Sequence, residues 1–354
     1  MKNSREPKNR LTLKLRPKSA SLLLITIIST SAKMSNSGRK INYSIRPAKS
    51  IERKMMRDIF SCLRHHAPLK DYQYIGFGSK YFVDFSLFHR HLGIEKLLSI
   101  ESDSTNTERY EFNKPYSSIQ MKFGKSTEVL PQLASQPGKK IYWLDYDGVF
   151  SPYMLDDAAI IAGTIESGSI YTASFNCSPL LGGTSHTDLS DDVEARLINL
   201  VGKAYVQPGI DARGWKQSKK LAIFLKECLK KEIQKIISIR NTALPEPEKI
   251  NIEQILFFRY ADGCEMATVA FAFFTEKDRH IHNSCRFNDL YFHRNEDSAF
   301  EIKTPNLTIK EIRHIMETMP NREKLSKKIF TDKDIDALWD NYRYFPNFTE
   351  IEST

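Results

Sequence analysis

Residues 72–101 read YQYIGFGSKYFVDFSLFHRHLGIEKLLSIE, and this stretch decides the fold. An apolar run at 72–77 ends in a glycine-rich turn, which predicts a buried strand followed by a tight connection. Residues 82–92 then repeat phenylalanine and leucine at helical spacing, and 96–100 form a second apolar run that ends at Glu101. The order strand, helix, strand predicts a parallel βαβ unit.

The same alternation continues on both sides of this unit. We expect a helix at 47–63, further strands at 119–123, 141–144 and 169–175, and helices at 105–112, 126–133 and 152–165. Strands that alternate with helices form right-handed crossovers, which build a doubly wound, mostly parallel sheet covered on both faces.

Two further apolar runs, 255–260 and 266–274, are separated by a short segment that contains Asp262-Gly263. An Asp-Gly pair between apolar runs this close predicts an antiparallel hairpin. The predicted fold is therefore an α/β, Rossmann-like sheet of five parallel strands closed by an antiparallel hairpin, with helical insertions.

Three regions are expected along the chain. They are a basic N-terminal extension at 1–40, for which disorder is expected, a sheet domain at 41–279 with a helical insertion at 185–250, and a C-terminal helical and aromatic extension at 280–354 packed on the core. Within the insertion, 217–240 has an apolar stripe and seven cations, as in an amphipathic helix with a charged outer face. Within the extension, we expect helices at 308–319 and 333–342, the first with a capping box made by Thr308 and Glu311.

The positive charge is confined to one end of the chain. The 354 residues carry a net charge of +9, but residues 1–40 hold ten basic side chains and one acid, and the rest holds 42 of each sign. A body without excess charge gives no general attraction to a nucleic-acid duplex. Small molecules, proteins and RNA all stay open as partners, and the sequence does not predict an oligomeric state.

The N-terminal extension has three interpretations. Basic residues, the apolar run 22–28 and small residues after it resemble a secretory signal, but the run is shorter than a membrane span. A disordered tail, or a natural start at Met34, is favoured over export. The five cysteines have no C-x-x-C spacing, which indicates reduced thiols and a cytoplasmic protein without a membrane segment.

Four segments should converge beyond the carboxyl ends of the strands, where open parallel sheets bind ligands. They are the turn with Gly76, Gly78 and Ser79, the acid Glu101 after the second strand, 123–126 after the third, and Asp145 with Asp147 after the fourth. Glycines let a ligand approach the backbone. An acid at the end of the second strand can accept both hydroxyls of a ribose.

The runs INYSIRPAKSIERKMM (41–56), YIGFGSKYFVDFSLFHRHLGI (74–94) and WLDYDG (143–148) carry a family resemblance. The chain resembles class I S-adenosylmethionine-dependent methyltransferases and, more narrowly, a group of bacterial O-methyltransferases. The resemblance implies S-adenosylmethionine as cofactor, held by Gly76, Gly78, Ser79, Glu101, Ser126 and Asp145. Tyr74 stands where the family usually has an acid, and Lys80 stands at the position of a third glycine.

Methyl transfer needs an aligned acceptor that can lose its proton. Asp145 and Asp147 are the candidates for base or positioning group at an oxygen acceptor, because no Asn/Asp-Pro-Pro-aromatic run, typical of base methylation, follows the fourth strand. Two carboxylates are too few to predict a metal site. Candidate substrate-binding residues are Arg46, Lys49 and Arg53, at helical spacing, and Asn176, after the fifth strand.

Two other functions stay open. A nicotinamide-dependent oxidoreductase shares the glycine turn and the acid of the second strand, although the closing hairpin argues against it. A non-catalytic member of the fold, acting as a binding or scaffold protein, is the second alternative, because Tyr74 and Lys80 depart from the family pattern.

Overall fold

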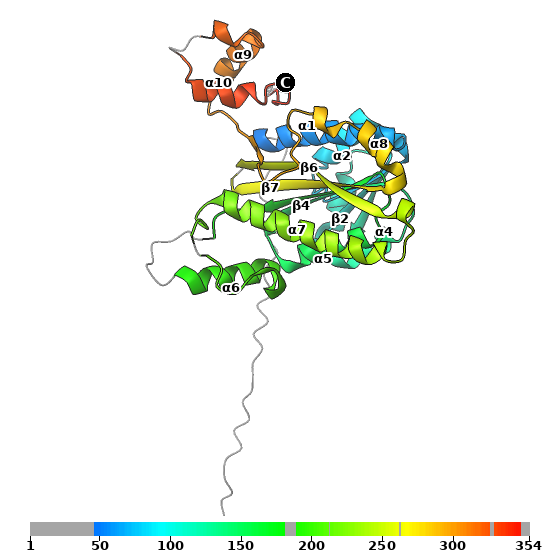
Figure 1. Cartoon of the computed structure of the whole chain (residues 1–354). Helices are drawn as coiled ribbons and strands as arrows, with labels where there is room; N and C mark the ends of the chain where they lie inside the picture. The colour runs from blue at the N-terminus through cyan, green and yellow to red at the C-terminus, as the bar shows by residue number, and fades with distance from the viewer. Residues whose placement is uncertain (1–45, 181–188, 212, 262, 326–328, 348–354) are drawn as a thin grey trace, which may run out of the picture. The chain divides into compact units, whose positions relative to one another are not determined.

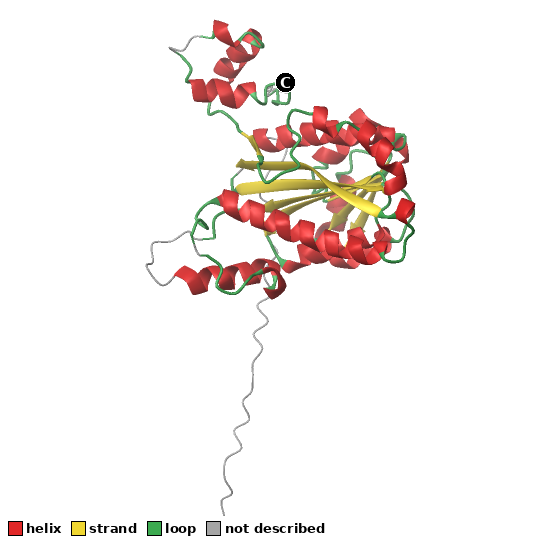
Figure 2. Cartoon of the chain, viewed as in Figure 1, coloured by secondary structure: helices red, strands yellow, loops and turns green. Residues whose placement is uncertain are grey.

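The computed structural model describes residues 46–180, 189–211, 213–261, 263–325 and 329–347. The predicted N-terminal extension, its signal-like run and Met34 lie outside the described residues. The described part contains one eight-stranded sheet with helices on both faces (Figure 1; Figure 2). Its strands are β1 Gln73–Gly76, β2 Lys96–Glu101, β3 Ile119–Phe123, β4 Lys140–Val149, β5 Ser169–Asn176, β6 Ile250–Ala261, β7 Glu265–Thr275 and β8 Phe300–Ile302.

The strand order is β3-β2-β1-β4-β5-β7-β6-β8. Strands β1 to β5 pair in parallel, whereas β7 is antiparallel to both β5 and β6. The predicted doubly wound sheet with a closing hairpin is therefore confirmed. The eighth strand is an addition that the sequence analysis missed: β8 pairs in parallel with β6 in a region expected to be helical and aromatic.

Helices cover the sheet in two layers, each with its own apolar core. The first layer contains α1 Pro47–Cys62, α2 Val83–Leu92 and α8 Arg279–Ser284, and the second contains α4 Ser126–Ala134, α5 Pro152–Thr164, α6 Leu189–Val201 and α7 Ser218–Asn241 (Figure 1). A short helix, α3 Thr107–Phe112, connects β2 to β3. Buried strands with both faces covered explain the nearly continuous apolar runs in the sequence.

The alternation of side chains along each strand assigns them to one core or the other. On β4, Ile141 and Trp143 join the core beneath α1 and α2, whereas Tyr142 and Leu144 join the core beneath α5 and α7. By the same period, Asp145 faces the α1 side. This parity places the candidate acid under the first helix.

The C-terminal region adds α9 Ile309–Thr318 and α10 Asp332–Trp339. The predicted capping box of α9 is present, with Thr308 accepting from the Glu311 N–H and the Glu311 side chain accepting from Thr308. The chain after α10 contacts α1, where the Tyr344 hydroxyl donates to Asp58 Oδ2 at 2.7 Å. The C-terminal residues are thus anchored to the same helix that faces β4.

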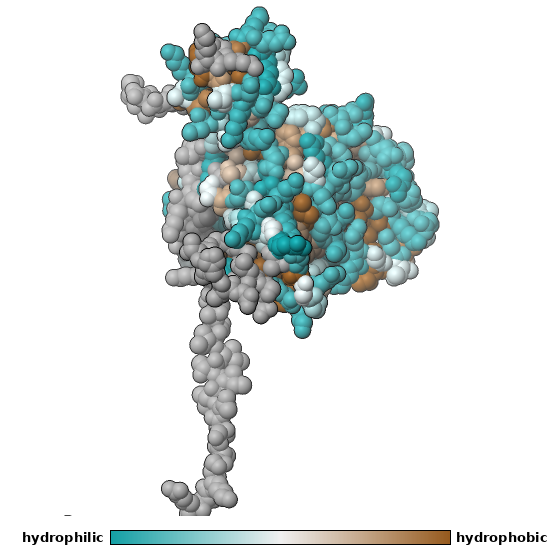
Figure 3. All heavy atoms as spheres, turned by 60° about the vertical axis from the view of Figure 1, so that its left-hand side comes forward, coloured by the Kyte–Doolittle hydropathy of each residue, from teal (hydrophilic) through white to brown (hydrophobic). Residues whose placement is uncertain are grey.

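The surface is largely hydrophilic on the face shown in Figure 3, with apolar residues in small groups. Across the described ranges, no helix combines the length and the apolar character needed to cross a bilayer. Large apolar side chains that are exposed include Phe112 and Val149. Single exposed apolar residues are ordinary on a protein surface.

Candidate functional site

Strand register brings the predicted site residues to one edge of the sheet. Gly76, the last residue of β1, pairs with Ser99 on β2 and with Trp143 on β4. Glu101 and Asp145 each lie two residues further along their strands, so they flank the turn that follows Gly76. The structure thus brings these three positions together, while their roles in binding stay predictions.

The turn after β1 requires glycine at two positions. A Cβ atom on Gly78 would lie 2.7 Å from the Phe82 ring and 2.8 Å from Ser99 Oγ, and one on Gly76 would lie 2.8 Å from Tyr74 Oη. The Gly78 N–H donates to Ser99 Oγ at 3.0 Å, which fixes the turn against β2. Ser79 has φ 47°, in the left-handed region.

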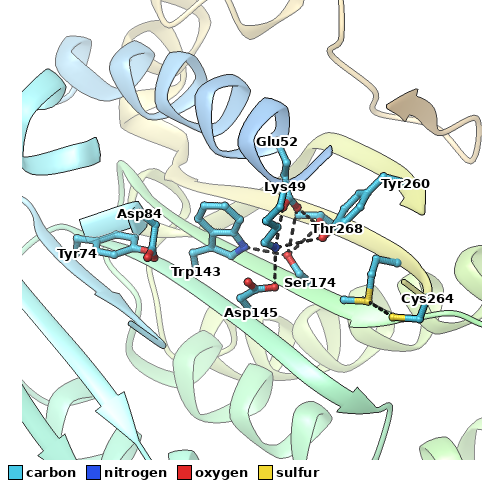
Figure 4. A network of polar contacts seen from close by, with 11 residues as sticks. Lys49, Glu52, Tyr74, Asp84, Trp143, Asp145, Ser174, Tyr260, Cys264 and Thr268 are labelled. Atoms are coloured by element: carbon cyan, nitrogen blue, oxygen red, sulfur yellow. Dashed lines mark hydrogen bonds and ion pairs between the residues drawn. The ribbon is translucent and has the colours of Figure 1, made fainter. Parts of the chain in front are cut away.

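A carboxylate that the sequence analysis missed lies beside this turn. Asp84, in the first turn of α2, accepts a hydrogen bond from the buried hydroxyl of Tyr74 (Figure 4). Burial raises the pKa of Asp84, and the nearby charge of Arg53 opposes that rise. Tyr74 therefore binds an acid that comes from the next helix. The other departure from the family pattern, Lys80, has its ammonium 5.2 Å from the Tyr81 ring.

Glu101 is half-buried at the end of β2. Its Oε1 accepts the Asp103 N–H at 3.1 Å, and its carboxylate is also hydrogen-bonded by Tyr110. Burial raises the pKa of Glu101, and the hydrogen bonds from Asp103 and Tyr110 oppose the rise. A carboxylate has about four acceptor sites, so Glu101 keeps acceptor capacity for ligand hydroxyls. This remaining acceptor capacity fits the hydroxyls of a nucleoside ribose.

Ser126 begins α4, and the N-cap position is Lys125, without a side-chain cap. Asp157 of α5 lies beside Ser126, whose hydroxyl opposes the rise in the pKa of that acid. Asp157 is 0% exposed, also accepts from Tyr146 at 2.9 Å, and has its pKa raised by burial to about 6. Ser126 is half-buried, next to this buried acid, at the position where adenine is expected.

Asp145 and Asp147 have different surroundings. Strand β4 continues to Val149 with an irregular register after Asp145, so Asp147 belongs to the strand rather than to a separate turn. Asp147 is exposed, and its charge contributes to the raised pKa of Glu101. Asp145 is 26% exposed and faces α1. The two acids therefore face different neighbours.

Asp145 contacts a buried cluster of charged and polar groups (Figure 4). The ammonium of Lys49 lies 2.7 Å from Asp145 Oδ1, 2.7 Å from Glu52 Oε2 and 3.1 Å from the Tyr260 hydroxyl. Asp145 and Tyr260 accept hydrogen bonds from this ammonium, and Glu52 pairs with it as a second counter-ion. Burial opposes the charge of Lys49, but Asp145 and Glu52 outweigh it and raise its pKa well above the ordinary value.

Glu52 extends the cluster into the sheet. It is 0% exposed, and its Oε1 accepts hydrogen bonds from Thr268 of β7 and, at 3.4 Å, from Ser174 of β5. The hydroxyl oxygens of Ser174 and Thr268 lie 2.7 Å apart, and the Trp143 indole N–H donates to the Ser174 hydroxyl at 2.9 Å. The cluster therefore connects α1 to β4, β5 and β7.

The four candidate substrate-binding residues occupy different environments. Lys49 and Arg53 are buried, with Lys49 bound to Asp145 and with the charge of Arg53 acting on Asp84. Arg46 precedes α1 and lies near the β6–β7 turn, its Nη2 3.9 Å from the Cβ position of Gly263. Asn176 accepts the Ser178 N–H at 2.8 Å. Direct contact of these residues with substrate stays a prediction.

A metal ion has no evident ligand set here. In the residues that the structure describes, no group of three or more histidine, cysteine, aspartate or glutamate side chains is arranged to hold one.

Comparison with known proteins gives a family match over most of the chain. The profile of the family described as "Putative O-methyltransferase" matches residues 41–353. No curated protein matches the chain.

Solved structures resemble the chain only remotely. An O-methyltransferase family protein from Burkholderia thailandensis is 8% identical, with a TM-score of 0.30 over 62% of this chain and 55% of that one. Spermidine synthase from Thermotoga maritima is 10% identical, with a TM-score of 0.34 over 71% and 67%. LepI, in a complex with SAM, is 10% identical, with a TM-score of 0.31 over 57% and 43%. The match thus spans about half the length of two of these chains.

The family match covers the sheet, the site residues and the C-terminal region together. The chain belongs to the family described as putative O-methyltransferases, which confirms the predicted family resemblance.

Proposed function

We propose that this protein transfers a methyl group from S-adenosylmethionine to an oxygen atom of its acceptor, with Asp145 receiving the hydroxyl of that acceptor. The observation that carries the proposal is the state of Asp145. It is part-exposed at the carboxyl edge of the sheet and held at Oδ1 by a fully buried ammonium. The acceptor itself stays unidentified, with small molecules, proteins and RNA as the candidate classes.

The residues at the carboxyl edge fit the cofactor. The turn from Gly76 to Ser79 would bring backbone close to the cofactor, Glu101 would offer acceptor sites to its ribose, and Ser126 would lie at its adenine end. When bound, S-adenosylmethionine supplies an electrophilic methyl group on a sulfonium, so the protein needs no covalent catalyst.

The remaining work belongs to the acceptor side. Lys49 fixes one oxygen of Asp145, which leaves the carboxylate in a single orientation as it accepts a hydrogen bond from the acceptor. A carboxylate in that position orients the oxygen nucleophile and takes its proton as the new bond forms. Asp145 is therefore assigned as base and positioning group, and exposed Asp147 is assigned to the cofactor side through its effect on Glu101.

Two measurements test this proposal. Calorimetric titration with S-adenosylmethionine and with NADPH should show binding of the first only, and tight binding of NADPH alone would favour the oxidoreductase. Binding of neither would favour the scaffold function.

Transfer of a radiolabelled methyl group into fractionated cell extract and a panel of phenols should then occur with the wild-type protein. The Asp145→Asn variant should lose about 100-fold or more in kcat/KM, with Asp156→Asn on the exposed face of α5 as control. Equal turnover by Asp145→Asn would remove Asp145 from the reaction.

A further inference from the structure

The ion pair that holds Asp145 also creates a difficulty for it as a base. If Asp145 takes a proton, it becomes neutral, and the ammonium of Lys49 loses a partner 2.7 Å away. Lys49 is 4% exposed, so water cannot replace that partner. A buried charge left without a counter-ion is strongly unfavourable. Some other group must therefore balance Lys49 at that moment.

Glu52 is placed to do so. Its Oε2 lies 2.7 Å from the same ammonium, at the same distance as Asp145 Oδ1, one turn along α1 from Lys49. We propose that Glu52 is the counter-ion that keeps Lys49 paired while Asp145 accepts a proton from the acceptor hydroxyl. Glu52 is thus a positioning residue that acts through Lys49, and this inference rests on the proposed function.

The proposal requires Glu52 to be ionised in the resting protein. Burial raises the pKa of Glu52, and the charge of Lys49 together with a chain of hydrogen bonds opposes that rise. The Trp143 indole can only donate, and it donates to Ser174. The Ser174 proton is then directed toward Thr268 or Glu52, and the Thr268 hydroxyl donates to Glu52 Oε1. Oε1 of Glu52 thus accepts hydrogen bonds from Thr268 and Ser174, and Oε2 forms the ion pair with Lys49, an arrangement that favours the carboxylate.

Net charge explains what the second carboxylate accomplishes. The cluster of Lys49, Glu52 and Asp145 carries one positive and two negative charges at rest, so the uptake of one proton makes it neutral. Without the charge of Glu52 the cluster would start neutral, and the same proton would leave an uncompensated positive charge in the interior.

The other charged groups around the cluster do not replace Glu52. Arg53, from α1, adds a positive charge that opposes that of Lys49, and Asp84 from α2 lies beside Arg53. Tyr260 from β6 contacts Lys49 through its hydroxyl, but burial raises its pKa well above the ordinary value, so it stays neutral.

The proton step balances. The O–H bond of the acceptor breaks, its electron pair stays on oxygen for the methyl carbon, and the proton forms a bond to a carboxylate oxygen of Asp145. Lys49 keeps all its protons and stays paired with Glu52. After the product leaves, Asp145 returns its proton to solvent from its exposed side.

The first test needs no acceptor. Infrared difference spectra between the wild-type protein and Glu52→Gln, near pH 8 and without ligand, should show the loss of carboxylate bands and the gain of glutamine amide bands, without the loss of a carboxylic-acid carbonyl band. Loss of a carboxylic-acid carbonyl band would mean that Glu52 is already protonated and would overturn the proposal. Glu232→Gln is the matched control, since Glu232 is also buried, at 8% exposure, and paired with a lysine, but in α7.

The second test uses para-substituted phenols of graded acidity as acceptors. Glu52→Gln should lower kcat by about 100-fold for weakly acidic phenols. The loss in kcat should be much smaller for acidic phenols, which lose their proton without help, and smaller for every phenol at higher pH. Glu52→Asp, which keeps the charge, should recover part of the loss, and affinity for S-adenosylmethionine should change less than twofold. An equal loss for every phenol and at every pH would indicate a merely structural role.

Failure of this inference and of the proposed function can be told apart. If the wild-type protein methylates no phenol, the oxygen-acceptor proposal fails for that class, and the infrared spectra still decide the charge of Glu52. If the wild-type protein methylates phenols and Glu52→Gln does so equally well, the counter-ion role alone is refuted.

Discussion

Lys49 and Asp145 lie 96 residues apart in the chain and are joined by a 2.7 Å ion pair that ties the first turn of α1 to the middle of β4. Lys49 lies in the first turn of α1, and α1 packs on the face of the sheet to which Trp143 points. The strand contributes the acid because Asp145 follows Trp143 at a spacing of two, on the same face. The pair therefore connects the N-terminal helix to the proposed acceptor position.

Removal of the Lys49 ammonium should destabilise the fold. Lys49→Met keeps the length of the side chain but leaves Glu52 buried without its counter-ion, which costs about 3–5 kcal/mol when a buried ion pair loses one member. Urea unfolding near neutral pH measures the loss. Since Asp145 and Glu52 raise the pKa of Lys49, the pair stabilises the protein at neutral pH, and its contribution should fall only as the pH rises through the alkaline range.

The control for that variant is Lys96→Met. Lys96 is exposed and hydrogen-bonded only to a backbone carbonyl of Asp71 among the described residues. It should change the free energy of unfolding by less than about 0.5 kcal/mol. Equal effects of the two substitutions would contradict the view that Lys49 is a structural partner of Glu52.

The glycine turn should not tolerate a methyl group. Gly78→Ala would place Cβ 2.7 Å from the Phe82 ring and 2.8 Å from Ser99 Oγ, so the turn must shift. We expect a loss of about 1–3 kcal/mol in stability and weaker binding of S-adenosylmethionine by calorimetry. Gly163→Ala in α5 is the control, since its Cβ would meet nothing within 4 Å and helices favour alanine. If Gly78→Ala bound the cofactor as tightly as Gly163→Ala, the turn would have no close contact with it.

The sequence predicts the sheet well because its signal is local. Apolar runs, the glycine turn and the Asp-Gly hairpin each lie within a few neighbouring residues, and the strands that they predict are present. Strand β8, only three residues long, has no such signal and exists because β6 offers it an edge.

The site residues that were missed have their partners on other helices and strands. Asp84 is ten residues from Tyr74, Asp157 lies on the helix after β4, and Glu52 is 216 residues from Thr268. The charges on α1 resemble a solvated helix face in the sequence, and only the strand ends beneath them make Lys49 and Glu52 a buried pair. Similarly, Lys226 was expected on the outer face of α7 but is 1% exposed, because Glu227 and Asp297 pair with it.

Asp157 should give the protein a recognisable pH dependence. Burial raises its pKa from 3.8 to about 6, so the folded protein binds its proton more tightly than the unfolded chain does. Stability from this group is fully present below about pH 4 and is lost as the pH rises through about 6. The shift corresponds to about 3 kcal/mol.

Asp157→Asn should remove this dependence. Urea unfolding measures the free energy of unfolding of both proteins between about pH 4 and pH 7. As the pH rises, the value for the wild-type protein should fall relative to that for the variant. Glu95→Gln, at an exposed position just before β2 and not among the groups that act on Asp157, should leave the wild-type curve unchanged. A wild-type curve parallel to that of Asp157→Asn would show that Asp157 keeps its ordinary pKa in the fold.

Glu101 should control affinity for the cofactor. Its carboxylate lies at the end of β2 with two protein donors, Asp103 and Tyr110, and with acceptor sites left for the ribose. Hydrogen bonds to a charged group contribute about 1.5–3 kcal/mol, so Glu101→Gln should weaken binding of S-adenosylmethionine by about 10- to 100-fold in calorimetry. Tyr110→Phe removes one of the donors that hold the carboxylate and should have a smaller effect of the same sign. Glu95→Gln, exposed just before β2, should have none. If Glu101→Gln bound S-adenosylmethionine like the wild-type protein, the ribose would have to lie elsewhere, and the assignment of the whole carboxyl edge as the cofactor site would fail with it.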